Sequence, residues 1–357
     1  MEKARFKWVL RERNRKIAAK TEAFTEQQAR RVRSFHSSFK EYSPTPLIEL
    51  TSLAQHLGIK NLFVKDESYR FGLNAFKVLG GSFAIGSYIA NELGEDIDDL
   101  PYMRLVSDEV RSLLGSKTFI TTTDGNHGRG VAWTANRLKQ QAIVYMPQGS
   151  AAERLANIRA EGAQAEITDM NYDDTVRYTS ELAQKNGWII VQDTAWDGYT
   201  RIPLWIMQGY MTMALEAYEQ LPVKPTHIFL QAGVGSLAGS VQGFFADIYG
   251  SSCPLTFIVE PKGADCLYQT AAANDGSLHR VTGRLETIMA GLACGEPNSI
   301  AWEILGNLSD GFISCPDYAA AQGMRILGNP LAGDTKVSAG ESGAATVGLV
   351  AEAMRDE

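Results

Sequence analysis

The stretch Phe71-Gly72-Leu73-Asn74-Ala75-Phe76-Lys77-Val78-Leu79-Gly80-Gly81 places one lysine among apolar and small residues. Burial among apolar neighbours disfavours the charged form of an amine, so we expect Lys77 to have a lowered pKa and a nucleophilic nitrogen. Such an amine can bond covalently to the aldehyde carbon of a cofactor. An alternative for this stretch alone is a surface lysine whose stem lies along apolar side chains.

Around this stretch, short apolar segments alternate with amphipathic ones. The predicted strands are 61–66, 117–122, 142–146, 164–168, 188–192, 227–230 and 255–259. The predicted helices are 50–57, 81–93, 130–140, 151–161, 173–186, 202–220 and 237–249. This alternation is typical of an α/β fold, with a parallel sheet covered by helices on both faces. Residues 1 to about 35 are predicted to be a peripheral lead-in whose helical stretch, 22–33, has little apolar face.

The composition excludes several classes of protein. A chain of 357 residues can hold two domains and bury a large core. The net charge is −7, and the basic residues near the start are interrupted by acids, so we expect no nucleic-acid partner. There is no apolar run of membrane-spanning length and no signal-peptide pattern, which favours a cytoplasmic protein with no membrane partner.

Ligands of open α/β sheets bind beyond the carboxyl ends of the strands, so the turns from strand to helix are candidate sites. The turn 121–128 combines small and polar residues that leave backbone N–H groups free for a carboxylate. Asp124 would repel such an anion unless it transfers a proton. A helix N-cap is the simpler interpretation of this turn taken alone.

Two further turns share this position. The glycine-rich turn 231–239 can bring backbone N–H groups close to a phosphate. It is also similar to a dinucleotide-binding motif, with Glu260 in place of the ribose-binding acid, although its third glycine comes one residue late. The turn 192–199 contains two carboxylates, Asp193 and Asp197, and a solvated loop is its simplest interpretation.

A phosphate site, an amine nucleophile and an anion site together are the requirements of a pyridoxal phosphate (PLP) centre. On these motifs the chain resembles the tryptophan-synthase-like, fold type II PLP enzymes, and more closely the diaminopropionate ammonia-lyases. The resemblance begins near residue 35 and continues to the last residue. The stretches that carry it are 74–77, 123–128, 192–196, 205–210, 232–236 and 289–298.

The resemblance implies two domains, each an open, twisted, mostly parallel sheet flanked by helices. Residues 1–85 and 205–357 would form the large PLP-binding domain, and 86–204 the small domain. It also implies a cytoplasmic homodimer that acts on a small amino acid. The implied reaction is the α,β-elimination of 2,3-diaminopropionate to pyruvate and two ammonia.

The resemblance also assigns roles to individual residues. Lys77 would form the covalent link with PLP, Asn126 would face the ring hydroxyl, and no metal is expected. Asp124 stands where the dehydratases have serine, and Asp193 would be the second carboxylate near the additional amino group of the substrate. The catalytic residues would be Lys77, Asp124 and Asp193. The remaining cofactor-binding residues would be Phe76, Gly233, Val234, Gly235, Ser236 and Gly291, and the remaining substrate-binding residues Thr123, Gly125 and His127.

Several alternatives stay open from the sequence. A serine or threonine dehydratase would require a small polar residue at position 124, and an NAD-dependent oxidoreductase would use the Gly233 turn and leave Lys77 idle. Members of the family continue past the helix that follows Gly340 into a strand and a Ser/Thr-bearing loop that meets the pyridine nitrogen. We therefore also consider a truncated PLP-binding protein with slower turnover. Cys266 and Cys294 are expected to be free thiols rather than a regulatory disulfide.

Overall fold

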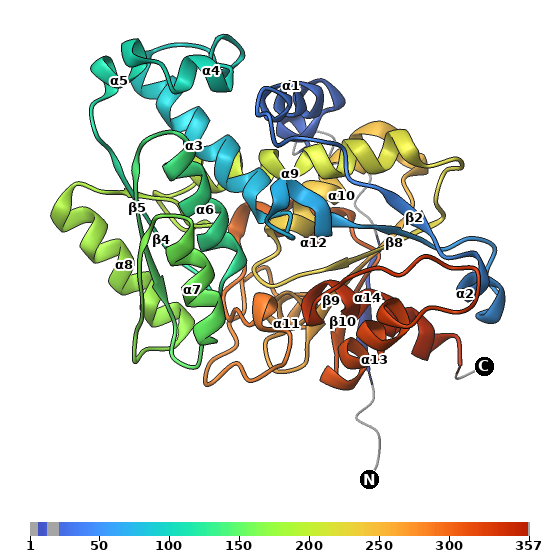
Figure 1. Cartoon of the computed structure of the whole chain (residues 1–357). Helices are drawn as coiled ribbons and strands as arrows, with labels where there is room; N and C mark the ends of the chain where they lie inside the picture. Colours follow the sequence, from blue (N-terminus) through green and yellow to red (C-terminus); the bar gives the residue numbers. More distant parts are fainter. Residues whose placement is uncertain (1–5, 13–20, 356–357) are drawn as a thin grey trace. The chain divides into compact units, whose positions relative to one another are not determined.

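The structure is a computed structural model that describes residues 6–12 and 21–355. The chain divides into two compact units, each with a four-stranded sheet of its own (Figure 1). The first unit consists of Met1–Glu22, Pro44–Tyr69 and Met213–Glu357, and the second of Ala23–Ser43 and Arg70–Thr212. The domain limits that the sequence predicts, near residues 85 and 205, stay a prediction.

The second unit is built on a parallel sheet with the strand order β6-β5-β4-β7. Its strands are β4 (Thr118–Thr122), β5 (Gln141–Met146), β6 (Gln164–Ile167) and β7 (Ile189–Ile190). They are connected by α6 (Asn126–Arg137), α7 (Ala152–Ala160) and α8 (Tyr172–Asn186) (Figure 1). The chain moves outward from β4 to β6 and then returns to place β7 on the other side of β4. Ligands of open α/β sheets bind at such a change of direction.

The remaining helices of the second unit lie before β4 in the sequence, except for the first part of α9. They are α1 (Glu26–Ser37), α3 (Lys77–Leu93), α4 (Tyr102–Leu105), α5 (Asp108–Leu114) and α9 (Arg201–Gln220). Helix α3 packs closely on α6 because residue 130 is a glycine. A Cβ atom added to Gly130 would lie 2.9 Å from the Cα atom of Val78.

The first unit contains three parallel strands in sequential order, β8 (His227–Gln231), β9 (Leu255–Pro261) and β10 (Gly311–Cys315). Strand β1 (Lys7–Leu10) completes this sheet by pairing antiparallel with β10. The helices that follow β8 in the sequence are α10 (Ser236–Tyr249), α11 (Cys266–Ala273), α12 (Ser299–Leu308), α13 (Asp317–Gly328) and α14 (Glu341–Ala353). The predicted α/β fold with mostly parallel sheets is therefore confirmed.

A smaller layer of the first unit surrounds α2 (Thr51–His56). Strands β2 (Leu47–Glu49) and β3 (Phe63–Lys65) form an antiparallel pair on either side of this helix in the sequence. The buried side chains of Leu53 and Leu57 belong to one apolar cluster with Leu327 from α13 and Val347 from α14. This cluster fixes α2 on the helices at the end of the described chain.

Three sequence-based expectations need correction. The helices predicted to begin at residues 81 and 130 begin four residues earlier, so Lys77 and Asn126 are their first residues. The described part of the lead-in contributes an edge strand, β1, which the sequence does not predict. Helix α1 has an apolar face after all, because Ala29, Val32 and Phe35 are buried. In the part of the chain that the structure describes, no helix is both long and apolar enough to cross a membrane.

Candidate active site

Lys77 is the first residue of α3, and its ammonium group is held by Asp193. The distance from Nζ of Lys77 to Oδ2 of Asp193 is 2.5 Å, and the two side chains are only 20% and 6% exposed. Nζ also lies 5.7 Å from the ring centroid of Phe76 and 5.9 Å from that of Tyr210. Burial lowers the pKa of Lys77, but the carboxylate of Asp193 outweighs burial and the net pKa is raised. The lowered pKa that the sequence predicts is therefore wrong for this arrangement.

Close packing of α3 on α9 places Tyr210 beside Lys77. A Cβ atom added to Gly209 would lie 2.4 Å from the carbonyl oxygen of Leu79, and one added to Gly80 would lie 2.6 Å from the Tyr210 ring. Only glycines allow the two helices to approach this closely. His36 contacts the same turn of α3, since its Nε2 lies 3.0 Å from the carbonyl oxygen of Leu79.

The Tyr210 ring contacts Phe76 edge to face, with ring centroids 5.0 Å apart. Its hydroxyl is buried and makes no hydrogen bond of good geometry among the described residues, but the Lys77 ammonium acts on it and opposes the rise of its pKa on burial. No sequence signal singles out Tyr210, because a tyrosine inside an apolar helix is usually a core residue.

The loop after β4 leads directly into α6. The Oγ1 atom of Thr123 accepts a hydrogen bond of 2.9 Å from the N–H of Gly125, and no side chain caps the helix. The N-cap interpretation of this turn is therefore wrong, and the first N–H groups of α6 have no capping side chain. Asn126 begins the helix with an exposed side chain, in contrast to the buried Thr123 and His127 on either side of it.

Asp124 lies in this loop and pairs with Arg154 of α7. The Nη1 atom of Arg154 donates to Oδ2 of Asp124 at 3.0 Å and to the carbonyl oxygen of Asp124 at 3.3 Å. Burial raises the pKa of Asp124 above its ordinary value, while the positive charges of Arg154 and Lys77 oppose the rise. Arg154 has no sequence signal, because it stands in an ordinary amphipathic helix.

The loop after β7 is not a solvated loop over its whole length, as the simplest interpretation of its sequence has it. Gln192 and Asp193 are buried, whereas Asp197 is exposed. The side chain of Gln192 accepts hydrogen bonds from the hydroxyl of Thr121 and the N–H of Thr122, both at 3.0 Å. The loop is thereby fixed to the end of β4, and the position of Asp193 is fixed with it.

The charge state of Asp193 follows from its neighbours. Burial raises the pKa of Asp193, but Lys77 and then His127 lower it, and the net value is about 2. Asp193 is thus ionised at neutral pH. Tyr199 holds the far side of the loop, since its hydroxyl donates to the carbonyl oxygen of Ile190 at 2.9 Å.

His127 is buried in the first turn of α6. Its Nε2 lies 2.8 Å from the carbonyl oxygen of Val191, so Nε2 carries the proton and donates it. Burial lowers the pKa of His127, which leaves a neutral ring whose Nδ1 is an acceptor. This Nδ1 has no hydrogen-bond partner in the described ranges 6–12 and 21–355.

The second unit therefore brings together four residues that the sequence singles out, Lys77, Asp124, His127 and Asp193, and adds Arg154 and Tyr210. Two cations face two carboxylates, and the imidazole is neutral. Each carboxylate has its own cation, Asp193 with Lys77 and Asp124 with Arg154. Burial of charged groups requires this kind of pairing.

The first unit holds the predicted phosphate loop, between β8 and α10. Gly235 is the N-cap of α10 with φ of +100°, and no side chain caps the helix. A Cβ atom at Gly233 would lie 3.2 Å from Cα of Leu292, directly after Gly291. Asn298 fixes the loop, because its side-chain amide donates to Oγ of Ser236 at 2.8 Å and its N–H donates to the carbonyl oxygen of Val234, also at 2.8 Å.

Glu260 does not have the ribose-binding role that the dinucleotide interpretation requires. Its buried carboxylate accepts hydrogen bonds from the N–H groups of Leu267 at 2.8 Å and Tyr268 at 2.6 Å, and thereby caps α11. Both oxygens already have backbone partners. Cys266 and Cys294 are not joined by a disulfide bond in the described structure.

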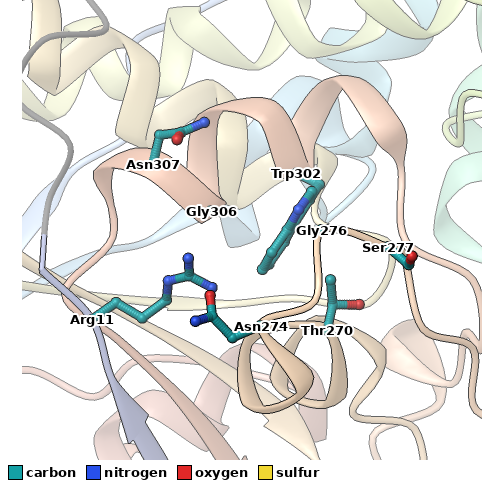
Figure 2. Close-up of a pocket in the computed structure, with 8 residues that line it drawn as sticks. All are labelled: Arg11, Thr270, Asn274, Gly276, Ser277, Trp302, Gly306 and Asn307. Carbon is teal, nitrogen blue, oxygen red and sulfur yellow. The ribbon is translucent and has the colours of Figure 1, made fainter.

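A small surface pocket of the first unit lies elsewhere (Figure 2). The guanidinium carbon of Arg11 lies 5.8 Å from the ring centroid of Trp302 at this pocket. None of the predicted site residues lines it. Among the residues that the structure describes there is also no cluster of three or more His, Cys, Asp or Glu side chains that could hold a metal ion.

Comparison with known proteins adds sequence evidence to this geometry. The sequence pattern of a family described as pyridoxal-phosphate dependent enzyme matches residues 39–357. The diaminopropionate ammonia-lyase of Salmonella typhimurium (strain LT2) is 53% identical over 330 residues, which cover 91% of this chain and 82% of that protein. The enzyme of the same name from Escherichia coli (strain K12) is 52% identical over 332 residues, which cover 92% and 82%.

Solved structures agree with the sequence comparison. The crystal structure of selenomethionine-containing holo diaminopropionate ammonia-lyase from Escherichia coli superposes with a TM-score of 0.90 and 48% identity. The match covers 98% of this chain and 87% of that one. A further structure of that enzyme, in complex with an aminoacrylate-PLP azomethine reaction intermediate, gives a TM-score of 0.88 at 48% identity, with the same coverage.

Proposed function

The chain belongs to the pyridoxal-phosphate-dependent enzyme family and, within it, to the diaminopropionate ammonia-lyases, and we propose that it eliminates ammonia from 2,3-diaminopropionate. Loss of one amino group from Cβ and hydrolysis of the remaining enamine give pyruvate and two ammonia, with one water consumed. The single observation that carries this proposal is the pair of carboxylates in the second unit, Asp124 and Asp193, each held by its own cation.

The charge balance of this cluster favours a substrate with a second amino group. In the absence of cofactor, Asp193 is paired with the ammonium group of Lys77, the group that would bind PLP. A buried carboxylate favours a cationic neighbour, and the alkylammonium group of the substrate would supply one beside Asp193. A hydroxyl substrate such as serine or threonine would bring no positive charge to this place.

We propose two bases for proton removal from Cα. Lys77 would take the proton from one enantiomer and Asp124 from the other, because the two side chains are expected on opposite faces of the cofactor ring. The cofactor, when bound, supplies an electron sink for the carbanion that forms at Cα. The assignment of all three catalytic residues, Lys77, Asp124 and Asp193, is part of this proposal.

The residues present fit PLP. Gly233 and Gly235 leave room that a Cβ atom would fill, and the uncapped N-terminus of α10 suits a phosphate. We propose that Val234, Ser236 and Gly291 complete this binding site. In the second unit, the exposed amide of Asn126 would face the ring hydroxyl, Phe76 would contact the cofactor, and Lys77 would bind it covalently.

The second group of contacts concerns the substrate. Thr123, Gly125 and the uncapped first turn of α6 would receive the substrate carboxylate. The unpaired buried Nδ1 of His127 offers an acceptor for a donor on the substrate or cofactor. The cytoplasmic location and the homodimer stay predictions.

A comparison of substrates tests the proposed reaction. We expect a higher kcat/KM for 2,3-diaminopropionate than for L-serine or L-threonine, with two ammonia released per pyruvate. A higher kcat/KM for L-threonine would favour the dehydratase alternative instead. For the two-base scheme, Asp124→Asn should abolish activity on one enantiomer and spare the other, and equal losses on both would refute it.

A further inference from the structure

We propose that Arg154 is a positioning residue that keeps the Asp124 carboxylate ionised and in place, and so sets the lowest pH at which Asp124 can accept a proton. The inference rests on the proposed function, since it concerns the enantiomer for which Asp124 is the base. It makes Arg154 a determinant of how the enzyme divides its activity between the two enantiomers.

The contact between Arg154 and Asp124 has two parts. One guanidinium nitrogen donates to the side-chain oxygen Oδ2 at 3.0 Å and to the main-chain oxygen of the same residue at 3.3 Å. A donor shared in this way fixes the side chain of Asp124 relative to its own backbone. The two side chains are 34% and 25% exposed, so the pair is partly withdrawn from solvent.

The stem of Arg154 lies against the same loop. A Cβ atom added to Gly125 would be 3.0 Å from Cδ, 3.4 Å from Cγ and 3.5 Å from Cβ of Arg154. A larger residue at position 125 would therefore push the arginine away from Asp124. The glycine in this loop thus has a second use besides the turn itself.

The position of Arg154 within α7 points to the same conclusion. Arg154 is the third residue of this helix, in the first turn, where the helix dipole favours anions and disfavours cations. The helix also has no side-chain cap at Ala151. The helix dipole therefore disfavours an arginine at position 154, whereas the ion pair with Asp124 favours it.

The titratable and charged groups that act on Asp124 come from four elements. They are Lys77 on α3, Asp193 after β7, His127 on α6 and Arg154 on α7, and the pair of Lys77 with Asp193 is already formed. His127 is neutral. Arg154 is therefore the cation that opposes the effect of burial on Asp124 most strongly.

The test compares Arg154→Gln with Arg154→Lys and with Arg159→Gln. The last variant removes a positive charge from the same helix, at a side chain that donates to the carbonyl oxygen of Ala165 and not to Asp124. For each holoenzyme, kcat/KM is measured against pH for both enantiomers of 2,3-diaminopropionate. For the enantiomer that Asp124→Asn abolishes, Arg154→Gln should move the acidic limb upward by about one pH unit.

The controls define the specificity of this effect. Activity on the other enantiomer should fall less in Arg154→Gln than activity on the enantiomer that depends on Asp124, and a circular dichroism spectrum equal to that of the wild type shows that the variant folds. Arg154→Lys should recover most of the shift, and Arg159→Gln should show none. An unchanged acidic limb in Arg154→Gln, or equal losses on both enantiomers, would overturn the proposal.

A second readout does not depend on turnover. Phenylglyoxal modifies accessible arginines, and mass mapping reports the rate at Arg154. The rate should rise severalfold in Asp124→Asn relative to the wild type, and an equal rate would show that the ion pair is not maintained. If the wild type does not act on diaminopropionate, the proposed function fails, and this labelling decides the inference about Arg154.

Discussion

The replacement Asp193→Asn removes the carboxylate that holds Lys77 while it keeps the shape of the side chain. Asp193 is 4% exposed, and its Oδ2 lies 2.5 Å from Nζ of Lys77. Loss of one partner leaves the other charge buried without compensation, and this is the destabilising part of such a change. The matched replacement on the other side is Lys77→Met, which keeps the apolar stem.

The magnitude follows from the pKa of Asp193. The pKa falls from its ordinary value of 3.8 to about 2 in the folded protein. At about 1.4 kcal/mol per pKa unit, this fall corresponds to a contribution of roughly 2.5 kcal/mol at neutral pH. We therefore expect each single replacement to lower the free energy of unfolding by at least that much. Removal of one partner from a buried ion pair typically lowers it by about 3–5 kcal/mol.

The assay is chemical denaturation of four cofactor-free proteins at pH 7: the wild type, Asp193→Asn, Lys77→Met and the double variant. The double variant should be less destabilised than the sum of the two single variants by about 2–3 kcal/mol, because both charges are then absent. Additivity of the two single effects would refute the ion pair as the determinant of the charge state of Lys77.

Three further predictions concern packing and pH. Gly209→Ala should destabilise the protein by at least about 1–3 kcal/mol, because the new Cβ would lie 2.4 Å from the Leu79 carbonyl oxygen. Gly343→Ala is the control: with nothing within 4 Å of its Cβ, it should be neutral or stabilise the protein by up to about 1 kcal/mol. Denaturation midpoints of the two variants would show the contrast. Tyr210→Phe removes a buried hydroxyl that makes no hydrogen bond of good geometry among the described residues, so the free energy of unfolding should not fall by more than about 0.5 kcal/mol, and a larger loss would reveal a hydrogen bond. Because the folded pKa of Asp193 is about 2 and its ordinary value is 3.8, its contribution is fully present above about pH 5 and is lost as the pH falls through 2 to about 1. Unfolding measured across that range should show a loss roughly 2.5 kcal/mol larger in the wild type than in Asp193→Asn, and parallel curves would contradict this.

Much of the fold can be predicted from the sequence because its signals are local. Strands β4, β5 and β8 are short apolar runs bounded by turn residues, and the helices between them have one apolar face. The order of strands then brings the loops after β4 and β7 to one edge. Strand β1 has no such signal, since it is defined by pairing with β10, about three hundred residues later in the sequence.

The charge state of the site is the part that the sequence cannot supply. The apolar neighbours of Lys77 predict a lowered pKa, but the dominant partner, Asp193, is 116 residues away. The same holds for Asp124, whose partner Arg154 belongs to a helix with no distinguishing pattern. The sequence shows which ionisable residues are present, whereas their ionisation depends on which charges the fold brings together.

Lys77, as the residue that binds the cofactor, is central to the proposed site and its chemistry. Reduction of the holoenzyme with sodium borohydride makes the link between cofactor and lysine permanent, and peptide mass mapping then locates it. We expect the added mass on the peptide that contains Lys77, with its loss in Lys77→Met. Added mass at any other lysine would contradict the assignment of the site.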